Sequence, residues 1–134
     1  MRKLIRVLIA DDQLRARKSL KALPSTSPCV GETYEVGDGR EAVQLAKDLQ
    51  PDIVLMDVRM PQLDGLKATA EIKALWPEMR VIVPSMYAQY CEEAWIAGAD
   101  AFIAKGDAPG ELVARWLPSW RRSEMLNSGC ELLM

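Results

Sequence analysis

The sequence predicts an α/β fold in which a five-stranded parallel sheet lies between two layers of helices. Short apolar runs alternate along the chain with amphipathic segments, which is the pattern of a βα unit repeated five times. Parallel strands need crossover connections that usually contain helices, so this alternation favours a three-layer sandwich. The chain has 134 residues, 49% of them hydrophobic, which suits one domain with its own core.

The first half of the chain predicts three strands and two helices. The strands are expected at residues 6–10, 30–36 and 53–57, the second with a weaker pattern than the others. The helices are expected at residues 14–23 and 42–50, because each of these segments has an apolar face and ends before a proline. A Gly-Asp-Gly sequence predicts the turn that leads into the second helix.

The second half continues the alternation with two more strands and three more helices. A helix stopped by a proline is expected at residues 66–75, and a strand at residues 80–83. A further helix at residues 88–97 can be capped by the glycine that follows it, and it leads into a short strand at residues 101–104. The apolar face of a last helix is marked by Leu112, Val113, Trp116, Leu117 and Trp120.

Composition excludes several classes of function. A formal net charge of -2 and a pI near 5.2 argue against direct nucleic-acid binding by this chain, since that needs a basic excess. The absence of histidine removes Ser-His and Cys-His catalysis, histidine metal ligands and a histidine phosphocarrier. Cys29, Cys91 and Cys130 have no CxxC spacing, so we expect free thiols in a reducing cytoplasm. The first apolar stretch, residues 7–10, is too short for a signal peptide or a membrane span.

Acidic residues follow two of the predicted strands. Asp11 and Asp12 end one apolar run, and Asp57 ends another. If these runs are neighbouring parallel strands, their carboxyl ends lie at the same edge of the sheet, where open α/β proteins build their sites. Three carboxylates so close together repel one another at neutral pH unless they are protonated or hold a cation. An oxygen-only cluster open to water suits Mg²⁺, so the pattern predicts a magnesium site with Asp57 available for chemistry.

Further motifs complete a pattern that extends from about residue 6 to residue 120. Asp11-Asp12 is followed by Asp57-Val58-Arg59-Met60-Pro61 and Asp64-Gly65, then by Ser85 after the fourth strand and Lys105 after the fifth. In this order the motifs resemble a response-regulator receiver domain of two-component signalling. The resemblance implies a flavodoxin-like (βα)5 sandwich. The residues around Asp57 and after Lys105 look most similar to the subfamily that usually carries a C-terminal helix-turn-helix output domain.

The resemblance also implies a role for each of these residues. Asp57 would be the phosphoacceptor, taking a phosphoryl group from a histidine kinase or a phosphotransfer protein. Mg²⁺ would be held by Asp11, Asp12, Asp57 and the backbone carbonyl of Arg59. Lys105 and Ser85 would contact phosphoryl oxygens, so that charge stabilisation provides the catalysis.

A conformational switch is implied by the same resemblance. Movement of Ser85 toward the phosphoryl group would open space for Phe102, three residues before Lys105. The face formed by the fourth helix, the fifth strand and the fifth helix would then change, and would control dimerisation or a partner, including transcriptional output. Arg59 and Met86 lie where the family tunes access of the hydrolytic water, and this bulky pair predicts slow dephosphorylation.

Two features depart from the family pattern or extend it. Pro84 stands where an apolar residue with a backbone donor usually precedes the switch hydroxyl, and it could alter the placement of Ser85.

We expect the receiver domain at residues 1–122 and a C-terminal tail at residues 123–134, which is frayed or bound to a partner and too short for an output domain. The sequence leaves open whether this is a stand-alone receiver or part of a transcription factor.

Other functions stay open beside the phosphoryl-accepting receiver. Because of Pro84, one is a receiver-like module that binds partners without phosphorylation. A Mg²⁺-dependent phosphohydrolase is less favoured, since Arg59 stands where such enzymes commonly carry a second acid. A flavodoxin-like cofactor binder is disfavoured because the first loop, Asp11-Asp12-Gln13, offers negative charge rather than donors to a phosphate. We therefore expect the chain to have no enzymatic activity beyond self-catalysed phosphoryl acceptance and autodephosphorylation.

Overall fold

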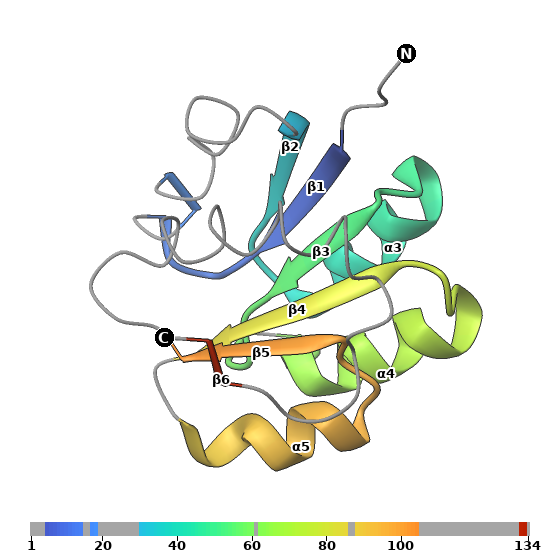
Figure 1. The fold of residues 1–134 in the computed structure, drawn as a ribbon. Coiled ribbons are helices and arrows are strands. Elements are labelled where there is room, and N and C mark those ends of the chain that lie inside the picture. Colours follow the sequence, from blue (N-terminus) through green and yellow to red (C-terminus); the bar gives the residue numbers. More distant parts are fainter. Residues whose placement is uncertain are drawn as a thin grey trace.

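A single parallel sheet forms the centre of the computed structural model, which describes residues 5–14, 17–18, 30–60, 62–85, 88–104 and 132–133. The strands are β1 (Ile5–Ala10), β2 (Val30–Val36), β3 (Ile53–Met56), β4 (Arg80–Ser85), β5 (Ala101–Ala104) and β6 (Leu132–Leu133). Their order across the sheet is β2-β1-β3-β4-β5-β6, and each neighbouring pair is parallel (Figure 1). The predicted parallel α/β fold is confirmed. The direction in which strands are added reverses after β2, which makes the carboxyl ends of β1 and β3 the switch point of the sheet.

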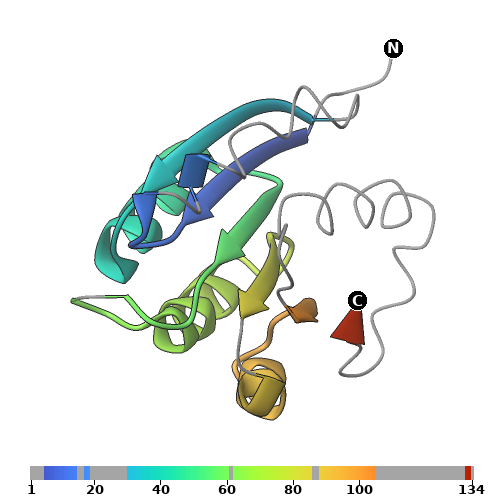
Figure 2. The same ribbon diagram turned by 90° about the vertical axis from the view of Figure 1, so that its left-hand side faces the viewer.

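Helices α3 (Gly39–Leu49), α4 (Gly65–Leu75) and α5 (Cys91–Ile96) lie on the same side of the sheet (Figure 2). The first two begin at aspartate caps, since Asp38 and Asp64 each accept a hydrogen bond from a backbone N–H of the first turn. The segment predicted as one helix at residues 88–97 is instead a 3-10 turn, η1 (Ala88–Tyr90), followed by α5. No side chain caps the start of α5, and 3-10 turns are frequent at helix starts. In the described part of the chain, no helix has the length and apolar character needed to cross a membrane.

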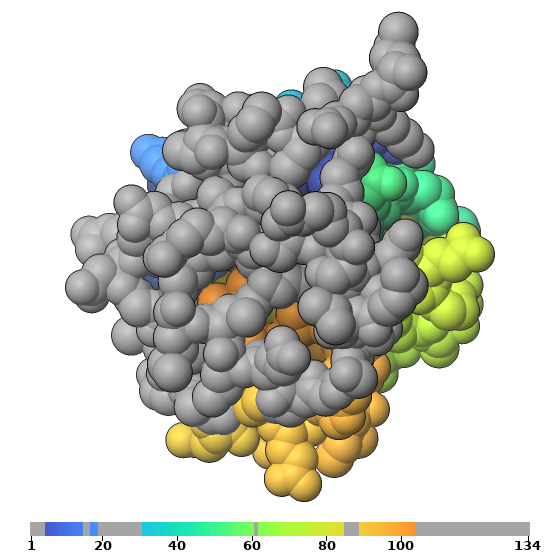
Figure 3. Space-filling model, viewed as in Figure 1, coloured from blue at the N-terminus to red at the C-terminus, as the bar shows by residue number. Residues whose placement is uncertain are grey.

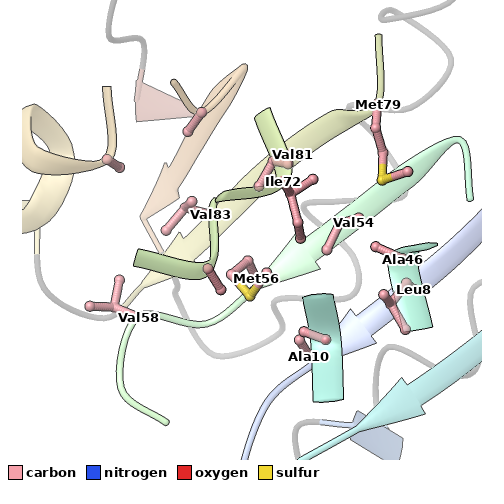
Figure 4. Close-up of a cluster of buried hydrophobic side chains, with 14 of the residues drawn as sticks. Leu8, Ala10, Ala46, Val54, Met56, Val58, Ile72, Met79, Val81 and Val83 are labelled. Carbon is pink, nitrogen blue, oxygen red and sulfur yellow. The ribbon is translucent and has the colours of Figure 1, made fainter. Parts of the chain in front are cut away.

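The main buried cluster lies between the sheet and these helices (Figure 4). Alternate residues of the strands point into it and meet small or apolar residues of α3 and α4: Leu8, Ala10, Val54, Met56, Val81 and Val83 from the sheet, and Ala42, Ala46, Ala68 and Ile72 from the helices. The residues between them along the strands, such as Val7, Ile53 and Ile82, are also fully buried. Burial on both faces is what a parallel sheet in a three-layer sandwich requires.

Pro84 is tolerated inside β4 because the pairing with β3 ends before it. Residues of β3 and β4 are paired only as far as Leu55 with Ile82. On the other side, β4 stays paired with β5 through Pro84 and Ser85. The backbone of Ser85 therefore remains part of the strand, and the side chain of Ser85 lies outside the described residues.

Several expectations fall on other parts of the chain or need correction. The helix expected at residues 14–23 is described only at residues 14, 17 and 18, which are helical, and the last helix, expected around residues 112–120, lies outside the described residues. The tail, expected to be frayed or partner-bound, instead contributes β6, in which Leu132 pairs with Phe102 and Leu133 with Ile103. All five predicted strands are present, and the two-residue strand β6 is added beside β5, where main-chain groups of the two strands pair.

A charged network ties two connections together at the amino-terminal edge of the sheet. Lys73 Nζ donates to the Asp100 carboxylate at 3.0 Å and to two backbone carbonyls of the connection between α4 and β4 at 2.8 and 2.9 Å. Asp100 also accepts from the Val81 N–H at 2.8 Å and from the Arg80 guanidinium at 3.4 Å. The side chains of Lys73 and Asp100 are only 15% and 11% exposed, so the network lies largely out of water. It joins the start of β4 to the residue that precedes β5.

Cys91, the first residue of α5, takes part in a disulfide bond. The expectation that all three cysteines are free thiols is therefore wrong for Cys91, while Cys29 and Cys130 lie outside the described residues. The spacing of cysteines along the sequence carries no signal for such a bond, because pairing depends on the distance between residues in space.

Replacing Asp100 by alanine should lower the free energy of unfolding by about 2–4 kcal/mol, because the Lys73 ammonium and the Val81 N–H lose a buried charged partner. Urea denaturation followed by circular dichroism measures this change. Asp48→Ala is the matched control, since Asp48 lies on the exposed side of α3 and accepts long 3.3 Å hydrogen bonds from Gln44. The Asp48→Ala substitution should lower the free energy of unfolding by less than about 0.5 kcal/mol. Equal losses in the two variants would contradict the role given to the network.

Candidate functional site

The pairing of β1 with β3 brings two acidic strand ends side by side. Ala10 is the register partner of Met56, so Asp11 and Asp57 directly follow paired residues. Main-chain hydrogen bonds hold both positions: the Asp57 N–H donates to the Ala10 carbonyl at 2.9 Å, and the Asp11 N–H donates to the Val36 carbonyl at 3.1 Å. The backbone thus carries both carboxylates to the switch point at the carboxyl edge of the sheet.

Asp11, Asp12 and Asp57 form a cluster of carboxylates at this edge. Each offers one oxygen atom, and these oxygens lie within 4.8 Å of one another. Asp11 is buried, Asp57 is half-buried and Asp12 is exposed, so the cluster opens to solvent on one side. Without a cation the three negative charges repel one another. A donor set made of carboxylate oxygens fits a hard divalent cation such as Mg²⁺.

Arg17 holds the loop that carries Asp11. Its Nη1 donates to the Asp11 carbonyl at 2.8 Å, and its Nε donates to Glu35 of β2 at 3.0 Å. The Asp11 carboxylate accepts from the Gln13 N–H at 2.9 Å, which forms a turn directly after β1. These contacts orient the buried carboxylate toward the cluster.

The loop after β3 is held by buried side chains and by one close backbone approach. Val58 and Met60 are 6% and 9% exposed, whereas Arg59 between them is exposed. The N–H of Gly65, at the start of α4, donates to the Val58 carbonyl at 2.7 Å. A Cβ atom at Gly65 would collide with the backbone carbonyl of Asp57, so only glycine allows α4 to approach this closely. The backbone of Asp57 is therefore fixed on both of its sides.

The remaining predicted site residues are described to different extents. Phe102 lies in β5, is 2% exposed and belongs to the main buried cluster. Ser85 ends β4, where its backbone pairs with Ala104 of β5. Lys105 follows β5 directly and lies outside the described residues. The roles expected for Ser85, Phe102 and Lys105 stay predictions.

Comparison with known proteins agrees with this arrangement of strands. Residues 7–116 match the family model described as the response regulator receiver domain. The chain belongs to this family. The receiver is 41% identical over 110 residues to the chemotaxis protein CheY of Thermotoga maritima, covering 81% of this chain and 91% of CheY. Its structure is similar to the response regulator domain of Thermotoga maritima CheB, with a TM-score of 0.78, 34% identity, and coverage of 92% of this chain and 97% of that domain.

A longer relative is matched by the receiver over part of its length. This relative is YxjL of Bacillus subtilis, named as an uncharacterized transcriptional regulatory protein. The two are 32% identical over 111 residues, which cover 81% of this chain and 51% of YxjL. The receiver therefore spans about half the length of this relative.

Two side-chain contacts at the site were missed by the sequence analysis. Arg59 Nη2 donates to the hydroxyl of Tyr90 at 3.4 Å, and Arg17 pairs with Glu35. The partners are 31 and 18 positions apart, and no periodicity relates them. Arg59 lies two residues after a predicted strand and Arg17 lies in a predicted helix, and neither position in the sequence indicates the partner. Sequence reasoning assigned Arg59 a carbonyl ligand and an influence on water access, but no side-chain partner.

Gly65→Ala should lower the free energy of unfolding by about 2 kcal/mol, because the added Cβ collides with the Asp57 carbonyl and backbone atoms must shift. Chemical denaturation followed by circular dichroism is the measurement. Lys67→Ala changes an exposed residue in the same turn of α4 and should stay within about 0.5 kcal/mol of the wild type. If the two variants unfold at the same denaturant concentration, the close approach at Gly65 is not the constraint described here.

Asp12→Asn should raise the melting temperature in a buffer that contains a chelator, because one of three mutually repelling carboxylates is removed. For this exposed residue the expected rise is about 1–3 °C. Mg²⁺ should then stabilise the wild type more than the variant, since the variant has lost a ligand. Calorimetry with EDTA and with Mg²⁺ measures both effects. No rise in EDTA together with an equal gain from Mg²⁺ would show that Asp12 is not part of a cation site.

Proposed function

We propose that this receiver accepts a phosphoryl group on Asp57 in a two-component phosphorelay. The observation that carries the proposal is the cluster of Asp11, Asp12 and Asp57 at the paired ends of β1 and β3, in a chain of the receiver family. The donor would be a histidine kinase or a phosphotransfer protein. This chain has no histidine, so the phosphohistidine must belong to the partner.

Asp57 would act as the nucleophile from the half-buried position in the cluster. Its carboxylate oxygen attacks the phosphorus atom and forms an O–P bond, while the bond from phosphorus to the donor nitrogen breaks and the electron pair leaves with the donor. Mg²⁺, held by Asp11, Asp12, Asp57 and the Arg59 carbonyl, would neutralise charge on the phosphoryl oxygens. Asp11 is suited to hold the cation directly or through water, because its buried carboxylate is already oriented by its turn.

Lys105 and Ser85 would complete the site from the ends of β5 and β4. These strands follow β3 in the order of the sheet, so their carboxyl ends lie at the same edge as Asp57. The Lys105 ammonium would pair with one phosphoryl oxygen, and the Ser85 hydroxyl would donate to another. Movement of Ser85 toward the phosphoryl group would make room for Phe102, which is buried in β5 and pairs with Val83, two residues before Ser85.

Output would pass through the face that contains α5, β5 and the last helix. The α5 segment lies at the lower edge of the space-filling view (Figure 3). Trp95 and Ile96 of this helix are 39% and 76% exposed, and Glu92 and Glu93 are exposed beside them in the sequence. Exposed apolar side chains of this kind suit contact with another protein or with a second copy of the chain. Phosphorylation would therefore control dimerisation or the binding of a partner, including a partner in transcription.

Residues 1–122 would form the receiver domain, and residues 123–134 would form a C-terminal tail. The chain would act in the cytoplasm as a signalling module that catalyses only its own phosphorylation and dephosphorylation. Direct binding to nucleic acid by these residues is not part of the proposal, since the net charge is -2. The disulfide at Cys91 is the observation that argues against this compartment, because cytoplasmic thiols are usually kept reduced.

Intact-protein mass spectrometry after brief incubation with Mg²⁺ and acetyl phosphate tests the proposal. The wild type should gain one phosphoryl group, and neither Asp57→Asn nor the wild type in EDTA should gain any. Asp64→Asn is the matched control and should still be phosphorylated, because Asp64 caps α4 and is not among the clustered carboxylates. Absence of an adduct on a folded wild-type protein that binds Mg²⁺ would overturn the proposal and favour a module that binds partners without phosphorylation.

A further inference from the structure

Arg59 and Tyr90 join the loop after β3 to the start of α5. Nη2 of Arg59 donates a hydrogen bond to the Tyr90 hydroxyl at 3.4 Å. Tyr90 is the last residue of η1 and directly precedes α5. Arg59 therefore has two connections: its backbone carbonyl is proposed as a cation ligand, and its side chain reaches the helix proposed as an output surface.

The guanidinium of Arg59 is the part of this connection that can move. Val58 and Met60 are buried on either side of Arg59, and the Val58 carbonyl accepts from the Gly65 N–H, so the loop backbone is held. The ring of Tyr90 is half-buried and packs against the main cluster, which keeps its hydroxyl in place. The Arg59 side chain is exposed, and 3.4 Å is long for a hydrogen bond. A phosphoryl oxygen would offer the guanidinium a stronger acceptor than the Tyr90 hydroxyl.

We infer that Tyr90 is a positioning residue that draws the Arg59 guanidinium away from Asp57, and that a phosphoryl group on Asp57 competes with Tyr90 for it. The inference rests on the proposed function. A phosphoryl group carries roughly two negative charges and three strong acceptor oxygens, whereas the tyrosine hydroxyl is neutral. Charge-assisted hydrogen bonds of arginine to phosphate are roughly twice as strong as neutral ones and are often bidentate. Phosphorylation thus weakens the connection between Arg59 and the start of α5.

The same competition sets how long the aspartyl phosphate persists. In hydrolysis a water oxygen attacks phosphorus while the bond from phosphorus to the Asp57 oxygen breaks. The carboxylate of Asp57 leaves with the electron pair, and the water gives up a proton to the phosphate product or to solvent. The water must approach phosphorus opposite the leaving oxygen of Asp57. A guanidinium bound to the phosphoryl group hinders this approach, and Tyr90 reduces the time that it spends there.

The half-life of the aspartyl phosphate tests the inference. Each variant is phosphorylated with acetyl phosphate and Mg²⁺, freed of the donor, and followed by intact mass. Tyr90→Phe keeps the ring in the core and should lengthen the half-life by roughly two- to fivefold. Arg59→Ala should shorten the half-life, and adding Tyr90→Phe to Arg59→Ala should change nothing further. Tyr34→Phe is the matched control: the Tyr34 hydroxyl donates to Glu32 of β2 at 2.8 Å, so its removal should leave the half-life unchanged.

The outcomes separate this inference from the proposed function. If no variant that retains Asp57 gains a phosphoryl group, the proposed function fails and the inference fails with it. If all variants that retain Asp57 gain a phosphoryl group, but the aspartyl phosphate has the same half-life in the wild type and in Tyr90→Phe, the inference alone is overturned. A change caused by Tyr90→Phe that persists in the Arg59→Ala background also overturns it, because Tyr90 would then act through the packing of its ring rather than through the guanidinium.

Discussion

The parallel register between β1 and β3 is the constraint on which the acidic site depends. Because Ala10 pairs with Met56, the next residue of each strand carries its carboxylate to the same edge of the sheet. A slip of one residue would turn the side chains of a whole strand to the opposite face and move one carboxylate out of the cluster. Such a slip is resisted by side chains of these strands that are buried in the core, such as Leu8 and Val54. Core packing and site geometry are therefore specified by the same residues.

Bringing three carboxylates together costs stability, and contacts around the site offset this cost locally. Asp11 is buried beside like charges, and Arg17 holds its loop through the Asp11 carbonyl. The loop of Asp57 is held by the close approach of Gly65. At the opposite edge of the sheet, Asp100 fixes connections that carry none of the proposed reactive groups. The sheet thus separates a solvent-open edge with clustered like charges from an edge where opposite charges are paired.

Much of this arrangement could be predicted because it depends on local patterns. An apolar run predicted β5 and a weaker pattern predicted β2, both with the bounds that the structure has, and acidic residues at strand ends predicted the carboxylate cluster. The contacts of Arg59 with Tyr90 and of Lys73 with Asp100 could not be predicted, since they join residues 31 and 27 positions apart that no periodicity relates. The division of one expected helix into η1 and α5 and the disulfide of Cys91 likewise depend on neighbours in space.

Residues 132–133 occupy the outer edge of the sheet beside Phe102 and Ile103. Uncovered edges allow another chain to add a strand, which is a common route to domain swapping and aggregation. With β6 in place, a second copy could extend the sheet beside β5 only after displacing it. The covered positions include Phe102, the residue proposed to respond to phosphorylation, so loss of β6 would leave main-chain groups of β5 open to pairing with another chain. If copies of the chain associate, contact through helix surfaces would leave this strand edge paired, and side chains rather than main-chain groups would then select the partner.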